Sequence, residues 1–139
     1  MSTEENKALA RRLFEEVLNQ KNVALIDEFY SPNYVEHTPN GPVHGTEAYK
    51  QYLMMYFTAF PDAHYTIEDQ IAEGEKVMTR WSVRGTHQGP LMGIPPTGKN
   101  STVTGMSIGR REGGKIVEAW TEFDTLGMLQ QLGVIPSMG

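Results

Sequence analysis

Asp124 is the residue of this chain whose type and position best suit acid/base chemistry. It stands where an alternating segment, residues 115–123, passes into a short apolar segment that ends before Gly133. Beside Trp120 in a partly dry pocket, a carboxylate would have its pKa raised from the reference of about 3.9, as a general base requires. The sequence Asp-Thr-Leu-Gly-Met-Leu is also a good helix start, in which the aspartate is a cap. Position alone leaves both roles open.

Four histidines could donate a hydrogen bond to a substrate carbonyl or exchange a proton near neutral pH: His37, His44, His64 and His87. His37 and His87 come at the ends of predicted elements, beside loops rich in Pro and Gly, where functional groups often lie. His64 alternates with polar neighbours and is expected at the surface. No pair has the spacing of a helical metal site such as H-E-x-x-H, so we expect no metal.

The composition excludes several other kinds of site. The chain has no cysteine, which removes disulfides, thiolate nucleophiles and cysteine–zinc sites. Its Ser and Thr residues lack the context of a nucleophile elbow, and it has no Walker or G-x-G-x-x-G motif, so neither a serine nucleophile nor a nucleotide site is expected. A net charge of -5 argues against a nucleic-acid partner. A carboxylate, histidines and aromatic side chains without a cofactor suit an acid/base pocket or a binding pocket.

Length and hydropathy predict one soluble domain over residues 1–139. The chain has 139 residues, of which 39% are hydrophobic and 21% charged, as in ordinary globular domains. No apolar run approaches the roughly 20 residues that a membrane span needs. The acidic, polar N-terminal segment lacks the pattern of a signal peptide. We therefore expect a cytoplasmic protein with no membrane partner.

The first part of the chain has helical spacing. Residues 3–19 carry apolar side chains at intervals of three and four, and Ser2 with Glu5 fits a capping box. A shorter helix is predicted after Asn22, with Tyr30 on its inner side, and it should end at Ser31-Pro32.

A loop and a third helix follow. Residues 33–45 read as a loop with one brief strand at 34–37. Thr46 is the predicted cap of a helix with a dense aromatic stripe, which Pro61 stops. Such a stripe suits a hydrophobic core better than a cofactor site.

From residue 64 the hydrophobic period changes from helical to two. Four strands are predicted, at residues 64–72, 76–86, 101–112 and 115–123. Helices followed by antiparallel strands predict an α+β fold, with helices on one face of a curved sheet. The long connection 87–100 is rich in Gly and Pro and carries Leu91, Met92 and Ile94, so we expect a shaped loop at the mouth of a pocket.

The last predicted strand has two different faces. One face carries Ile116, Glu118, Trp120, Glu122 and Asp124, and the other carries Val117, Ala119, Thr121 and Phe123. On hydrophobicity alone the second face belongs in the core and the first in water. Periodicity would place Asp124 in a pocket only if helices covered one face of the sheet and a partner subunit covered the other.

Ordered motifs along nearly the whole chain resemble those of the SnoaL-like polyketide cyclases, within the NTF2-like superfamily. The matching segments are YVEHTP at 34–39, FPD at 60–62, RW at 80–81, RGTHQG at 84–89, GIPPTGK at 93–99, GKIVEAW at 114–120, Asp124 and QLG at 131–133. The set is specific for the family and not for a substrate.

The resemblance implies a cone-shaped α+β barrel. N-terminal helices would pack on a strongly curved, mainly antiparallel sheet that encloses a pocket. The resemblance also implies a homodimer or higher homo-oligomer, often built on the outer sheet surface. In that arrangement the Trp120/Glu122/Asp124 face would line the cavity, and the Val117/Phe123 face would pack outward against a partner.

The resemblance also implies a reaction. In the family, an aspartate at the position matching Asp124 is the acid/base of an intramolecular aldol condensation of a polyketide methyl ester, without cofactor or metal. The histidine that the cyclases carry on the strand matching 101–112 is missing, since this chain has Met106, Ser107 and Ile108 there. A histidine that polarises the carbonyl would have to be His37 or His87.

The leading hypothesis is a cofactor-independent, cyclase-like enzyme of the lyase or isomerase type. It would remove a proton next to a carbonyl of a hydrophobic small molecule, with Asp124 and His37 as catalytic residues. The predicted substrate-binding residues are Phe14, Tyr34, Trp81, His87, Met106, Trp120 and Glu122. The alternatives are a non-catalytic protein that binds a small ligand, and an isomerase or hydrolase of the same superfamily.

Overall fold

The computed structural model describes residues 2–136. Its first helix, α1 (Thr3–Arg12), begins at Ser2, whose hydroxyl accepts from the Glu5 backbone while the Glu5 carboxylate accepts from the Ser2 backbone. The predicted capping box is confirmed. The helix continues as π-helical turns over Leu13–Asn19, so the single helix predicted for 3–19 is present with a change of pitch.

The second predicted helix is shorter than expected. A single turn at Val23–Leu25 leads into α2 (Ile26–Phe29), and strand β1 (Tyr30–Thr38) begins at once. Tyr30 is therefore a strand residue, because Pro32 lacks an N–H and favours extended backbone. The chain turns back as β2 (Gly41–His44), a strand that the two prolines and two glycines of 33–45 did not suggest.

Helix α3 (Thr46–Ala59) buries an aromatic stripe, as predicted, with Tyr49 and Phe57 each 5% exposed. The capping prediction for Thr46 is wrong. Gly45 occupies the cap position with a φ of 87°, a backbone conformation that glycine adopts freely. Thr46 is the first helical residue and is buried.

The four predicted strands are all present: β3 (His64–Glu73), β4 (Lys76–Thr86), β5 (Asn100–Glu112) and β6 (Lys115–Phe123). Together with β1 and β2 they form one sheet in the order β2-β1-β6-β5-β4-β3. Neighbouring strands are antiparallel except β1 and β6, which are parallel. The predicted α+β class and mainly antiparallel sheet are confirmed.

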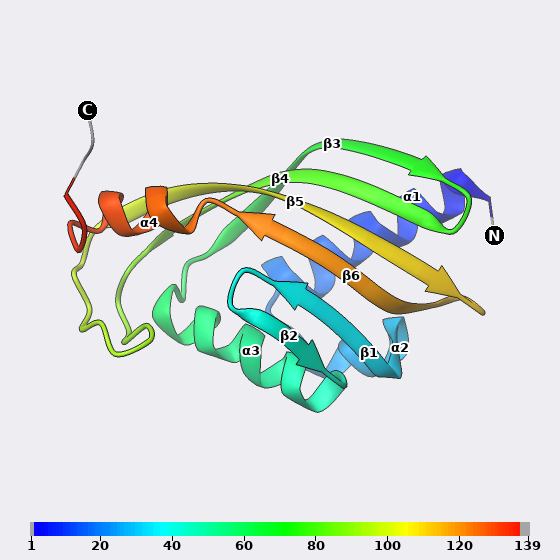
Figure 1. Cartoon of the computed structure of the whole chain (residues 1–139), viewed down its shortest axis with the longest axis horizontal. Coiled ribbons are helices and arrows are strands. Elements are labelled where there is room, and N and C mark those ends of the chain that lie inside the picture. The colour runs from blue at the N-terminus through cyan, green and yellow to red at the C-terminus, as the bar shows by residue number, and fades with distance from the viewer. Residues whose placement is uncertain (1, 137–139) are drawn as a thin grey trace.

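The sheet arches over the helices (Figure 1), with α1 and α3 on its concave side. The larger buried cluster joins side chains from the N-terminal helices, α3 and the inner face of the sheet, including Phe14, Tyr34, Tyr49 and Trp81. Helix α4 (Thr125–Gln131) follows β6 and contributes Met128 to a second cluster at the end of the sheet. Among the described residues, no helix is both long and apolar enough to cross a membrane.

The connection between β4 and β5 is shaped but does not lie at the mouth of the main cavity. It lies at the end of the molecule that carries α4 (Figure 1). Leu91 is 0% exposed and packs in the second cluster, whereas Met92 is 48% exposed. The predicted position is wrong because Leu91 anchors this connection beside the C-terminal end of α3.

Candidate active site

A largely apolar cavity of about 160 Å³ lies between the concave face of the sheet and the helices. Phe14 from the π-helical turns, Tyr34 from β1 and Trp81 from β4 line it, as predicted. Tyr52 and Tyr56 of α3 face it from the helical side. The arrangement surrounds a ligand with aromatic rings and leaves few polar groups to orient it.

The face of β6 that reaches this cavity is the apolar one. Ile116, Ala119, Thr121 and Phe123 line it. The pairing with β5 shifts by one residue between Arg110 and Arg111, so β6 carries an extra residue, Val117. The bulge puts Ile116 on the same side as Ala119, which strict alternation does not allow.

The predicted inward orientation of Trp120, Glu122 and Asp124 is therefore wrong, as is the outward orientation of Phe123. Trp120 is 37% exposed, and Glu122 is exposed on the same outer surface. Hydrophobicity alone assigned the faces correctly from Glu118 onward, but not for Ile116, which the bulge turns inward. The helices cover the inner face by themselves, so no polar face is needed to complete the cavity wall.

Asp124 caps the last helix. Its carboxylate oxygen Oδ1 accepts a hydrogen bond of 2.9 Å from the backbone N–H of Gly127, and its side chain is exposed. It borders a second, more open pocket, together with Met106 and Glu122. Of the two roles left open by the sequence, the structure shows the cap, and Asp124 has no contact with the main cavity.

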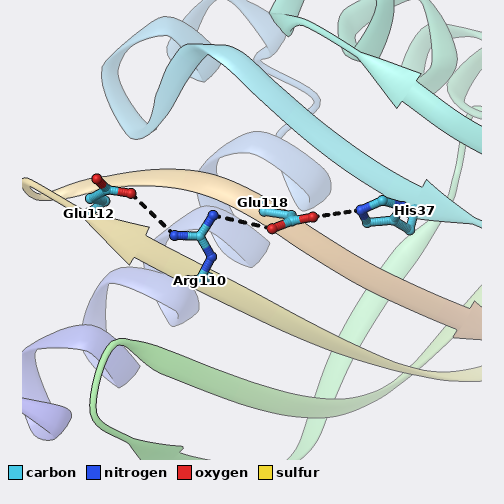
Figure 2. Close-up of polar contacts among 4 residues, drawn as sticks. All are labelled: His37, Arg110, Glu112 and Glu118. Carbon is cyan, nitrogen blue, oxygen red and sulfur yellow. Dashed lines mark hydrogen bonds and ion pairs between the residues drawn. The ribbon is translucent and has the colours of Figure 1, made fainter.

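His37 also lies on the outer surface. Its Nε2 is 2.7 Å from Glu118 Oε2, and its ring stacks on Trp120 with 5.5 Å between centroids. Figure 2 shows Glu118 between His37 and Arg110, on the side of the strands away from the N-terminal helices. Arg110 donates to Glu118 at 3.2 Å, and hydrogen bonding to His37 holds the pKa of Glu118 below its usual range. His37, predicted as a catalytic residue, does not line the main cavity.

The last predicted substrate-binding residue, His87, is fully buried but away from the cavity. Its Nδ1 accepts from the backbone N–H of Thr97 at 3.2 Å, and its ring packs on Phe60. These contacts fold the β4–β5 connection. His87 thus has a structural place in the described chain and does not line the cavity.

The carboxylate that does line the cavity is Glu36 of β1, which is 7% exposed. Burial raises the pKa of Glu36 to about 7, and hydrogen bonds from the hydroxyls of Thr121, Tyr34 and Tyr49 offset part of that effect. A carboxyl group with this pKa exchanges its proton near neutral pH, as an acid/base catalyst does.

Glu36 ends a chain of hydrogen bonds that crosses four strands. The Trp81 indole donates to Ser107 Oγ at 3.0 Å, and the hydroxyls of Ser107 and Thr121 are 3.0 Å apart. Thr121 donates to Glu36 Oε1 at 2.9 Å, so Ser107 is the donor to Thr121. We call Trp81, Ser107, Thr121 and Glu36 the polar chain. Its donors all point toward the carboxylate and fix the position of that group.

Sequence reasoning missed Glu36, although a signal was present. Residues two apart on a strand share a face, so Glu36 had to lie on the same side as Tyr34. The brief predicted strand at 34–37 contained both residues. His37 drew attention because of its residue type, yet the same alternation sends it to the opposite side.

A cone-like α+β fold with one apolar cavity and a buried carboxyl group is typical of proteins that bind small hydrophobic molecules. Comparisons with known proteins agree. Residues 8–132 match the family model described as SnoaL-like polyketide cyclase. The chain belongs to this family.

A curated relative is aklanonic acid methyl ester cyclase DnrD of Streptomyces peucetius. It is 30% identical over 107 residues, which cover 76% of this chain and 72% of that protein. Among solved structures, IdmH of Streptomyces antibioticus is 32% identical, with a TM-score of 0.81 over 93% of this chain and 99% of that one. AclR of Streptomyces galilaeus is 28% identical, with a TM-score of 0.88 over 99% of this chain and 87% of that one.

Proposed function

We propose that this protein is a cofactor-independent enzyme that moves a proton next to a carbonyl of a small hydrophobic molecule, with Glu36 as the acid/base group. The observation that carries the proposal is a carboxyl group with a pKa of about 7 in the wall of an apolar cavity. Membership of a cyclase family and the relative named as an ester cyclase support an aldol-type ring closure as the overall reaction.

Ionised Glu36 would take the proton from the carbon next to the carbonyl. The resulting enolate carbon attacks a second carbonyl of the same molecule and forms the new C–C bond. Glu36, now protonated, returns the proton to the alkoxide that this attack produces, so the group ends in its starting state. The enzyme's main contribution is to hold the two carbons close together.

Tyr52 is suited to stabilise the developing negative oxygen. It lines the cavity from α3, and its hydroxyl is buried close to Thr38 and Tyr56. Burial raises the pKa of Tyr52, so the hydroxyl keeps its proton and remains a donor. A donor already placed in a dry site stabilises an oxyanion without having to reorganise.

Cavity size restricts the substrate. An apolar cavity of roughly 150 Å³ holds a molecule such as benzene, and this one measures about 160 Å³. A one-ring carbonyl compound therefore fits the structure as it stands. A polyketide ester with several rings exceeds this volume.

Deuterium exchange into a simple ketone tests the proposal without knowledge of the natural substrate. In D₂O, the wild-type protein should speed deuterium incorporation next to the carbonyl of phenylacetone, followed by NMR. The Glu36→Gln variant keeps the side-chain shape and loses the base, so the acceleration should fall by about a hundredfold or more. Asp124→Asn is the matched control on the outer surface and should keep the wild-type rate.

A folded Glu36→Gln variant with undiminished exchange would contradict the assignment. Loss of exchange in Asp124→Asn would instead restore the aspartate as the base. A non-catalytic ligand-binding protein is the second candidate, favoured by the scarcity of polar groups in the cavity. It predicts saturable binding of phenylacetone without any exchange above the buffer rate.

We also propose that two copies of the chain pair through the outer sheet surface. Paired positions on adjacent strands form an outer stripe of Ile71, Met78, Ile108, Trp120 and His37. Ile71 and Ile108 are 58% and 38% exposed. Charged side chains of both signs flank the stripe, among them Arg110 and Glu118, so a two-fold axis can bring opposite charges together.

A further inference from the structure

Arg111 is a buried cation whose charge the described protein does not neutralise. It is 4% exposed and lies on the inner face of β5, where it lines the cavity. Its guanidinium makes one hydrogen bond within residues 2–136, from Nη2 to the backbone oxygen of Asn6 at 3.4 Å. Its Nε has no partner, and no carboxylate of these residues forms an ion pair with it.

The neighbouring arginine shows the contrast. Arg110 faces the outer surface and pairs with both Glu112 and Glu118 at 3.2 Å (Figure 2). Arg111 receives no such partner, although a buried charge without a counter-ion costs several kcal/mol. A guanidinium in proteins stays protonated, so this cost is not avoided by loss of the charge.

We infer that Arg111 binds the carboxylate of the ligand, so that the substrate class is a small hydrophobic carboxylic acid. A carboxylate can accept two parallel N–H bonds from a guanidinium. Arg111 lines the cavity and its guanidinium makes a single hydrogen bond within residues 2–136, so it keeps donors for this arrangement. The inference refines the proposed function, because it concerns the same cavity.

Arg111 and Glu36 would act on different parts of one ligand. Ser107, two steps along the polar chain from Glu36, lies four residues before Arg111 on β5, which corresponds to about 13 Å of strand. Burial raises the pKa of Tyr30, Glu36 adds to the rise and Arg111 opposes it, so Tyr30 lies near both charged groups. Both residues line the same cavity, so a ligand whose carboxylate is held by Arg111 would share that cavity with Glu36.

The test compares phenylacetate with phenylacetamide, which has nearly the same shape and no charge. Isothermal titration should show that wild-type protein binds phenylacetate about tenfold or more tightly than the amide, equivalent to about 1.4 kcal/mol. Arg111→Met should bring the two affinities together. Arg111→Lys should retain part of the preference, and Arg110→Met, the control on the outer face, should retain all of it.

Three results would overturn the inference: equal affinities in the wild type, a preference that survives in Arg111→Met, or no binding of phenylacetate at millimolar concentration. Thermal melts check that each variant is folded. Arg111→Met is expected to fold, because it replaces a buried unpaired charge by an apolar side chain. Glu36→Gln should keep the preference for phenylacetate. Failure of the carboxylate site is therefore distinguishable from failure of Glu36 as the base.

Discussion

Glu36 in β1 and Asp124, directly after β6, are both carboxylates, but their surroundings differ. Glu36 is enclosed by tyrosine hydroxyls and apolar rings, and burial raises its pKa to about 7. Asp124 is exposed and caps the first turn of α4. Residue type nominates both side chains for acid/base chemistry, and only burial distinguishes them.

The raised pKa of Glu36 makes the stability of the protein depend on pH. Between pH 4.5, the ordinary pKa of a glutamate side chain, and about pH 7, the folded state binds more protons than the unfolded state. The stabilising contribution is complete below 4.5 and is lost as pH rises through 7, by about 3 kcal/mol. Glu36→Gln should remove this dependence, so urea unfolding should find the variant more stable than wild type at pH 8.

At pH 4.5 and below, the stability advantage of Glu36→Gln should disappear, because Glu36 is then neutral in both states. Parallel pH–stability curves for the two proteins would show that Glu36 titrates normally. Glu122→Gln, an exposed substitution on β6, is the control and should leave the curve unchanged.

Asp124→Ala should lower the free energy of unfolding by about 1 kcal/mol, because the backbone N–H of Gly127 loses its acceptor. Urea unfolding measures the loss. Exchange of phenylacetone hydrogens should continue at the wild-type rate, since Asp124 does not reach the cavity. Unchanged stability would show that the cap contributes nothing.

At the scale of elements, β5 positions the polar chain because Gly105 has no side chain and leaves room for the Trp81 ring. A Cβ on Gly105 would lie 2.3 Å from the Trp81 ring, closer than side chains approach. Gly105→Ala should therefore displace Trp81, break its 3.0 Å bond to Ser107 and lower stability by about 1–3 kcal/mol. Thermal melts and Trp fluorescence report both effects.

Gly109 provides a matched control on the same strand and the same face. A Cβ there meets nothing within 4 Å. Gly109→Ala should leave the Trp81 environment unchanged. If the two variants melted alike, the contact between Gly105 and Trp81 would not be what positions the indole.

The limits of sequence reasoning also appear at the scale of elements. Strands β3 to β6 were predicted within about one residue, because their alternation is regular and turns bound them. The start of β1 at Tyr30 was missed because its partner β6 comes from a distant part of the chain. The whole of β2 was missed although it pairs with the adjacent β1, because its segment is rich in Gly and Pro. The hydrophobic pattern of the sequence does not predict the bulge at Val117, yet this bulge determines which side of the sheet Ile116 faces.

For the whole molecule, order of elements and motifs predicted the fold class and the family. The position of the acid/base group could not be predicted in the same way. The family resemblance placed the polar face of β6 inward. Hydrophobicity placed that face outward, and the structure agrees with hydrophobicity. The cavity needs only the helices and one face of the sheet, and the exposed outer stripe remains available for assembly.

The proposed pairing through the outer stripe predicts a particle of about twice the chain mass of 15.6 kDa. Light scattering after size exclusion should find this dimer for the wild type and a monomer for Ile108→Glu, because a carboxylate would be buried in an apolar interface. Met92→Glu, at an exposed position outside the stripe, should remain dimeric. A monomeric wild-type protein at high micromolar concentration would contradict the pairing.

The most direct test of the central claim is the titration of Glu36 itself. NMR of protein labelled with ¹³C at the glutamate carboxyl carbon follows every glutamate, and Glu36→Gln identifies the signal of interest. We predict that this signal titrates with a midpoint of about 7. A midpoint near the ordinary value of about 4.3 would contradict the claim that this buried carboxyl group exchanges its proton at neutral pH.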